Sequence, residues 1–192
     1  MPTGTPPHKK FEREISDEYR LEMVNVAVGG MRNVYVSDYE IKNGEKSFTA
    51  ETLKWLKNSL SQTDEIYLYT GSDMFMTIDK WRDPETIFSI ANVVCLSRTG
   101  HDKEKLLEQK DRLEREYGAR CRVIPFEPIE ISSSDVRKMI REKDEDARLY
   151  LPESLTMKFS VAMPDEEMRE AFCHSIDNHY MRDVSYTVDG ST

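Results

Sequence analysis

The sequence predicts an α/β fold built around a mostly parallel sheet. Three observations support this fold class: short apolar runs typical of buried strands alternate with helical segments, these segments are long enough to serve as crossovers, and a glycine follows the first clear strand. With 192 residues, the chain is long enough for one core-forming domain. We therefore expect β–α–β units with right-handed connections.

The first part of the chain is expected to contain two helices separated by a β-like stretch. Apolar residues recur every three or four positions from Ser16 to Ala27, with a serine cap at the start and Gly29-Gly30 as a stop signal. A β-like stretch follows from Asn33 to Tyr39. A second helix is predicted from Thr49 to Leu60, because its leucines fall on one side.

Three later segments are predicted to be strands. Glu65 to Thr70 is rich in Ile, Tyr and Leu and ends at Gly71, as expected for a buried parallel strand that meets a loop. Ala91 to Leu96 and Cys121 to Phe126 give the next two strands. Ligands of such sheets bind beyond the carboxyl ends of the strands, so this edge is where we expect the site.

Helices are predicted between and after these strands. Asp83-Pro84-Glu85 opens one of them, with proline at the first helical position. Asp102 to Tyr117 is a charged surface helix that Gly118 is placed to end. The alternation of strands and helices makes the predicted fold Rossmann-like.

Composition excludes several classes of function. A formal net charge of -9 argues against broad binding to nucleic acid or a membrane surface, which would need a basic face. Cys95, Cys121 and Cys173 lie far apart and form no CxxC pair, so we expect neither a disulfide framework nor a zinc site. The chain has no apolar run of membrane-spanning length and no apolar signal core at its start, and we expect a cytoplasmic protein.

A hydroxyl-rich turn, residues 131–137 (ISSSDVR), leads into a helix start with Arg137 one turn inside. Backbone N–H groups at a helix N-terminus carry partial positive charge, so serine hydroxyls and a guanidinium there suit a phosphate. The alternative is an ordinary N-cap, since serine is favoured at that position and Asp135 suits a first turn.

Several segments, taken in order, resemble the bacterial nicotinate mononucleotide adenylyltransferases. They are residues 2–9 (PTGTPPHK), 47–53 (SFTAETL), 70–73 (TGSD), 80–81 (KW), 91–100 (ANVVCLSRTG), 131–137 (ISSSDVR) and 150–154 (YLPES). The resemblance implies a nucleotidyltransferase-like α/β domain over residues 1–155. Residues 156–192 form a C-terminal extension of unassigned role, with a strand-like Met157–Ala162 and a helix from Pro164 to about His179.

The reaction implied by the resemblance joins two small molecules in NAD biosynthesis. The phosphate of nicotinate mononucleotide attacks the α-phosphorus of ATP, giving deamido-NAD and pyrophosphate. The attacking phosphate is already ionised near neutral pH, so catalysis consists mostly of alignment and charge neutralisation, with Mg2+ shielding the triphosphate. The sequence leaves oligomeric state open, a homo-oligomer included.

The resemblance also implies which residues bind ATP. They are Gly71, Asp73, Ser132, Ser133, Ser134 and Arg137. Asp73 can accept hydrogen bonds from ribose hydroxyls, and Arg137 has the catalytic role because it neutralises charge on the phosphates. The competing interpretations are an Asx turn at Asp73 and a solvated helix arginine at Arg137. We expect Asp73 and Arg137 to share one cavity.

Three residues are implied for nicotinate mononucleotide, each with an alternative. Thr49 would recognise the carboxylate, or is only the N-cap of its helix; Trp81 would stack on the pyridine ring, or is a core tryptophan. Lys9 would line the phosphate region, or is solvated. Arg82 stands where the family often has an aromatic residue, and its positive charge could attract the nicotinate carboxylate.

The chain departs from the family at its start. The glycine-rich strand end followed by His-x-Gly-His is absent ahead of residues 6–9, and Phe11 occupies the position that a second histidine after His8 would need. We expect that the first strand of the sheet and most of the second are missing, and that Met1 is an internal methionine roughly 40 residues into a longer protein. The alternatives are a sibling nucleotidyltransferase with another phosphate acceptor and a non-catalytic nucleotide-binding fragment.

Overall fold

The computed structural model of the chain describes residues 1–2, 17–43, 48–98, 103–127, 129–142 and 144–155. These residues fall into two units. The sheet unit is the described part of Ser47–Ile129, and the helical unit is the described part of Met1–Lys46 and Glu130–Arg182. The predicted division into residues 1–155 and 156–192 stays a prediction, and the strand and helix expected over residues 157–179 lie outside the described residues.

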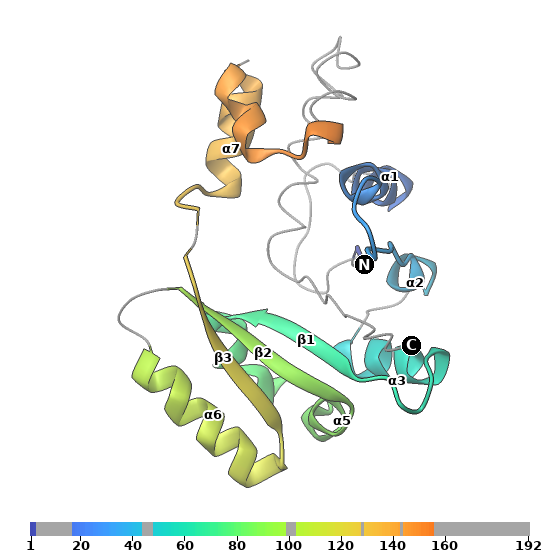
Figure 1. Ribbon diagram of the computed structural model, residues 1–192, viewed down its shortest axis with the longest axis vertical. Coiled ribbons are helices and arrows are strands. Elements are labelled where there is room, and N and C mark those ends of the chain that lie inside the picture. Colours follow the sequence, from blue (N-terminus) through green and yellow to red (C-terminus); the bar gives the residue numbers. More distant parts are fainter. Residues whose placement is uncertain (3–16, 44–47, 99–102, 128, 143, 156–192) are drawn as a thin grey trace. The chain divides into compact units, whose positions relative to one another are not determined.

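The sheet unit contains three parallel strands, as the sequence predicts. They are β1 (Ile66–Gly71), β2 (Ala91–Arg98) and β3 (Arg120–Phe126), hydrogen-bonded in the order β1-β2-β3 (Figure 1). In the register, Leu68 is paired with Val93, and Val93 with Cys121. Side chains alternate along a strand, so these three residues lie on one face of the sheet.

One apolar core joins that face to three helices. The helices are α3 (Thr49–Ser59), α5 (Pro84–Ile90) and α6 (Lys103–Tyr117). Leu53, Ile87 and Leu106, one from each helix, belong to the same buried cluster as the strand residues. Burying a side chain of this size contributes about 1.5–3 kcal/mol, so the helical faces that the sequence marks as apolar stabilise the unit.

The end of α6 confirms the role predicted for Gly118. This residue has φ 64°, the left-handed conformation that glycine adopts without a steric cost. Its N–H donates to the carbonyl of Glu114 at 3.1 Å, which satisfies a carbonyl left over at the helix end. The chain can then turn directly into β3.

The helical unit contains two of the helices that the sequence predicts. They are α1 (Asp17–Val28) and α7 (Ser133–Arg141). Met23, Val136 and Leu155 form a second, smaller buried cluster. The unit also contains α2 (Tyr39–Lys42) and the 3-10 helix η2 (Glu145–Tyr150), both too short for the sequence pattern to show. Within the described residues, no helix is both long and apolar enough to cross a membrane.

The prediction of a β-like stretch from Asn33 to Tyr39 is wrong. Asn33 has φ 61° and belongs to a turn, Val34 and Tyr35 are 44% and 78% exposed, and α2 begins at Tyr39. Residues with strand propensity form a strand only when a neighbour pairs with their backbone. No strand in the described residues pairs with this stretch.

Candidate functional site

The carboxyl end of β1 leads directly into a short helix that carries Asp73. Gly71 ends the strand and precedes α4 (Ser72–Phe75), so the segment expected to be a loop is helical. Asp73 is exposed, and in the described part of the chain no hydrogen bond of its carboxylate closes an Asx turn. Its backbone oxygen accepts from the hydroxyl of Thr77 at 3.2 Å. The exposed carboxylate of Asp73 therefore lies at the end of β1 and takes part in neither the Asx turn nor the Thr77 contact.

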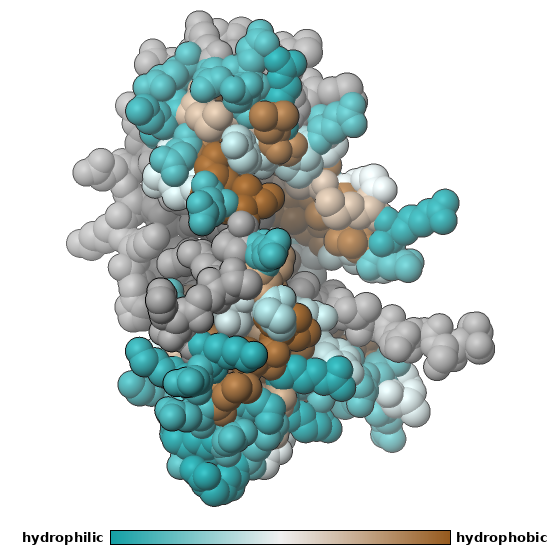
Figure 2. Space-filling model, turned by 60° about the vertical axis from the view of Figure 1, so that its left-hand side comes forward, coloured by the Kyte–Doolittle hydropathy of each residue, from teal (hydrophilic) through white to brown (hydrophobic). Residues whose placement is uncertain are grey.

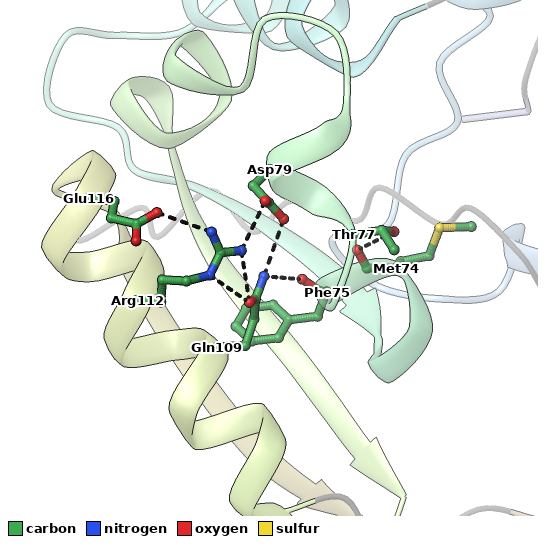
Figure 3. Close-up of polar contacts among 7 residues, drawn as sticks. All are labelled: Met74, Phe75, Thr77, Asp79, Gln109, Arg112 and Glu116. Atoms are coloured by element: carbon green, nitrogen blue, oxygen red, sulfur yellow. Dashed lines mark hydrogen bonds and ion pairs between the residues drawn. The ribbon is translucent and has the colours of Figure 1, made fainter.

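A polar network fastens the segment after Asp73 to α6 (Figure 3). Arg112 Nη2 lies 2.9 Å from Asp79 Oδ2, in the 3-10 helix η1 (Ile78–Lys80). Gln109 Nε2 donates to Asp79 Oδ1 at 3.3 Å and to the Phe75 carbonyl at 3.4 Å, while Arg112 Nη1 reaches Glu116 at 3.0 Å. The network thus holds the chain between the two predicted ligand contacts at positions 73 and 81.

The network changes the acidity of Asp79. Partial burial alone would raise the pKa of this carboxyl, but the hydrogen bond and charge of Arg112 outweigh burial and hold the pKa below its usual value. Sequence reasoning missed these residues. Gln109 and Arg112 show only helical spacing in the sequence, and their partner Asp79 is thirty residues away from Gln109, so no local pattern could have revealed the pairing.

A second set of contacts in the sheet unit joins the start of α3 to the turn before α5, and these two segments form a corner. The Cζ atom of Arg82 lies 4.2 Å from the centroid of the Phe48 ring, and Lys54 Nζ lies 2.9 Å from Asp83 Oδ2. The Lys54 hydrogen bond holds the pKa of Asp83 below its usual value. The residues adjacent to Thr49 and Trp81 therefore touch, although these two positions are far apart in the sequence.

The structure refines the interpretations of Thr49 and Trp81. Thr49 is not the N-cap of α3. Phe48 occupies that position, and its carbonyl accepts from the amides of Glu51 at 2.9 Å and Thr52 at 3.1 Å. Trp81 is half-buried and packs against the core cluster, so part of its indole stabilises the unit while the rest is accessible.

The hydroxyl-rich turn forms a complete capping box. Ser132 is the N-cap of α7 and its hydroxyl accepts from the Asp135 amide at 3.1 Å, while the Asp135 carboxylate accepts from the Ser132 amide at 3.1 Å. The hydroxyl of Ser132 also donates to this carboxylate at 2.6 Å, which holds the pKa of Asp135 below its usual value. The capping interpretation is confirmed for Ser132.

Arg137 is buried in the first turns of the same helix. It is 8% exposed, so it is not a solvated helix arginine. Its Nη2 donates to the Ser134 hydroxyl at 2.7 Å, which places a guanidinium and a hydroxyl together on α7. A buried cation is stable only with compensating polar partners, and Ser134 supplies one of them.

Three predicted features stay predictions. Lys9 lies outside the described residues, as does the side chain of Ser133. Asp73 belongs to the sheet unit and Arg137 to the helical unit, so their convergence in one cavity also stays a prediction. Among the described residues, no group of three or more His, Cys, Asp or Glu side chains is placed to hold a metal ion.

Comparison with known proteins places the chain in a family. The family described as Cytidylyltransferase-like matches residues 1–139. Three proteins named "Probable nicotinate-nucleotide adenylyltransferase" are similar to this chain. They come from Clostridium botulinum (strain Eklund 17B / Type B), Clostridium perfringens (strain 13 / Type A) and Clostridium beijerinckii, and are 37%, 38% and 34% identical to this chain. The matches cover 81%, 79% and 81% of this chain and 76%, 74% and 78% of those proteins. The chain therefore belongs to the cytidylyltransferase-like family and, within it, to the nicotinate-nucleotide adenylyltransferases.

Proposed function

We propose that the chain transfers the adenylyl group of ATP to nicotinate mononucleotide, giving deamido-NAD and pyrophosphate for NAD biosynthesis. The observation that carries this proposal is the similarity, over about four fifths of the chain, to proteins named for this activity. The α/β fold adds support, because such sheets bind nucleotides at the carboxyl ends of their strands.

ATP would be held by the end of β1 and by the start of α7. Gly71 lets the backbone approach a ligand closely, and the exposed carboxylate of Asp73 would accept hydrogen bonds from ribose hydroxyls. Around Ser132, Ser133 and Ser134, amide N–H groups at the helix start would face the phosphates. This assignment is compatible with the capping box, since a helix leaves four N–H groups without an intrahelical partner.

Nicotinate mononucleotide would bind at the corner formed by α3 and the turn before α5. The accessible part of the Trp81 indole offers a flat face for the pyridine ring. Thr49, the first residue of α3, would contact the carboxylate at the positive end of the helix dipole. Lys9 would contribute positive charge near the phosphates.

The chemistry needs alignment more than proton transfer. An oxygen of the nucleotide phosphate forms a bond to the α-phosphorus of ATP, and the bond from this phosphorus to the bridging oxygen breaks as pyrophosphate leaves. Arg137 would neutralise charge that builds up on the triphosphate, and Mg2+ would enter bound to ATP. We propose a cytoplasmic enzyme whose partners are its small-molecule substrates. The net charge of -9 supports the proposal that it has no nucleic-acid or membrane partner.

Product formation tests the proposal. Purified protein is incubated with ATP, Mg2+ and nicotinate mononucleotide, and pyrophosphate and deamido-NAD are measured together. We expect equal amounts of the two products, and no pyrophosphate when the acceptor is left out. Folded protein that binds ATP but yields no deamido-NAD from nicotinate mononucleotide would show that the proposal is wrong.

A further inference from the structure

A half-buried indole and an exposed cation follow each other in the sequence, at residues 81 and 82 of the turn before α5. Trp81 is half-buried against the core, whereas Arg82 is exposed. A cation–π contact holds the guanidinium of Arg82 in place, because its Cζ atom lies 4.2 Å from the centre of the Phe48 ring. Stacking of this kind uses the face of the guanidinium and leaves its in-plane N–H groups able to donate.

The charge of Arg82 is not cancelled by its neighbour. Asp83 is next in sequence, but its carboxylate is 2.9 Å from Lys54 Nζ. Within the residues that the structure describes, no acidic side chain forms an ion pair with Arg82. The turn thus carries a guanidinium that no described carboxylate pairs with, one residue after the half-buried indole of Trp81.

We propose that Arg82 binds the carboxylate of the nicotinate ring and determines the preference for the acid over the amide. This inference rests on the proposed function and names a residue that selects its substrate. A flat ring bearing a carboxylate matches the pair in chemistry: the indole of Trp81 contacts the ring, and the guanidinium fork donates to both carboxylate oxygens. The amide of nicotinamide is uncharged and offers one acceptor oxygen in place of two, so it would gain a weaker bond from the same guanidinium.

Equilibrium binding tests the inference without requiring turnover. Calorimetry gives the dissociation constants of nicotinate mononucleotide and nicotinamide mononucleotide for the parent chain, Arg82→Met and Arg82→Lys. Arg82→Met should lower the acid-to-amide affinity ratio by at least ~10-fold, because binding of the acid weakens more than binding of the amide. Arg82→Lys keeps the positive charge and should retain a larger ratio than Arg82→Met. Arg115→Met, an exposed arginine of α6, is the matched control and should leave the ratio unchanged.

The outcomes separate this inference from the proposed function. An unchanged ratio in Arg82→Met, or equal ratios in Arg82→Met and Arg82→Lys, overturns the inference even if the parent makes deamido-NAD. A parent that prefers the acid, loses that preference in Arg82→Met and yet forms no product supports the inference and contradicts the catalytic proposal. If Arg82→Met does not fold, Phe48→Leu replaces it: removing the stacked ring should also lower the ratio, and an unchanged ratio overturns the inference.

Discussion

Ser132 and Arg137 lie one turn and a half apart on α7 but have different physical roles. Ser132 caps the helix and is exposed, whereas Arg137 is buried and bonded to Ser134. The cap could be predicted from the sequence, because Ser at the N-cap with Asp three positions later satisfies two backbone groups locally. The burial of Arg137 could not, since it depends on how the helix packs.

The first prediction concerns the acid sensitivity of the helical unit. The pKa of Asp135 is lower in the folded chain than its usual value of 3.8, so its carboxylate stabilises the fold fully above about that pH and progressively less as the pH falls through the folded pKa. Asp135→Asn should therefore be less stable than the parent at pH 7, and the difference should shrink as the pH falls below about 3.8. Urea unfolding at a series of pH values measures this difference. Glu153→Gln, at an exposed acidic residue of the same unit, is the matched control.

The second prediction concerns Arg137. Arg137→Ala should weaken use of ATP by roughly 1.5–3 kcal/mol, the loss expected for a hydrogen bond to a charged group, and should affect binding of nicotinate mononucleotide less. Steady-state kinetics with each substrate varied in turn give the two values. Lys138→Ala, exposed on the same helix, is the control. Equal losses for the two substrates would contradict a role at the triphosphate.

At the scale of whole elements, long periodic segments were predictable and short ones were not. The three strands, α3 and α6 were predicted because many side chains of each share one buried face. The helix α4 and the 3-10 helix η1 are too short to show a period, so the sequence indicated only a loop. Their placement instead depends on contacts with α6 across a long sequence separation.

The third prediction tests those contacts by a double-mutant cycle. Asp79→Asn and Arg112→Met, singly and combined, should give a coupling energy of up to ~1 kcal/mol in the free energy of unfolding, limited by the partial exposure of Arg112. Asp79 is 12% exposed at its side chain and Glu116 is 46% exposed. The cycle of Arg112→Met with Glu116→Gln should therefore give a smaller coupling, and equal couplings would mean that the network does not fix the segment.

At the scale of the whole molecule, the chain forms two units whose boundaries do not follow the sequence order. The sheet unit lies between two stretches of the helical unit along the chain, which periodicity alone does not reveal. In the lower part of Figure 2, hydrophilic side chains predominate on the face shown and apolar ones form small separate patches. Such a surface agrees with the acidic composition but could not be mapped before the fold was known.

The fourth prediction concerns cooperative opening of the sheet unit. Cys95 and Cys121 belong to one core, and burial raises the pKa of their thiols to about 11 and about 12. With few thiolates and little exposure at pH 8, both should react with iodoacetamide only when the unit opens. Their rates, followed by peptide mass spectrometry, should rise together with urea. A rate for either residue near that of a free cysteine peptide without urea would show that the core is not closed.

The backbone conformation at Asp83 limits which residues can replace it during evolution. Its φ of 55° is left-handed, and Pro84 follows it at the first position of α5. Branched side chains are strained at this angle, whereas glycine, asparagine and aspartate tolerate it. Of these three, aspartate alone supplies a carboxylate to Lys54. Evolutionary drift at position 83 is thereby confined to a few residue types. Homologues that keep the proline should have aspartate, asparagine or glycine before it, whatever substrate they bind.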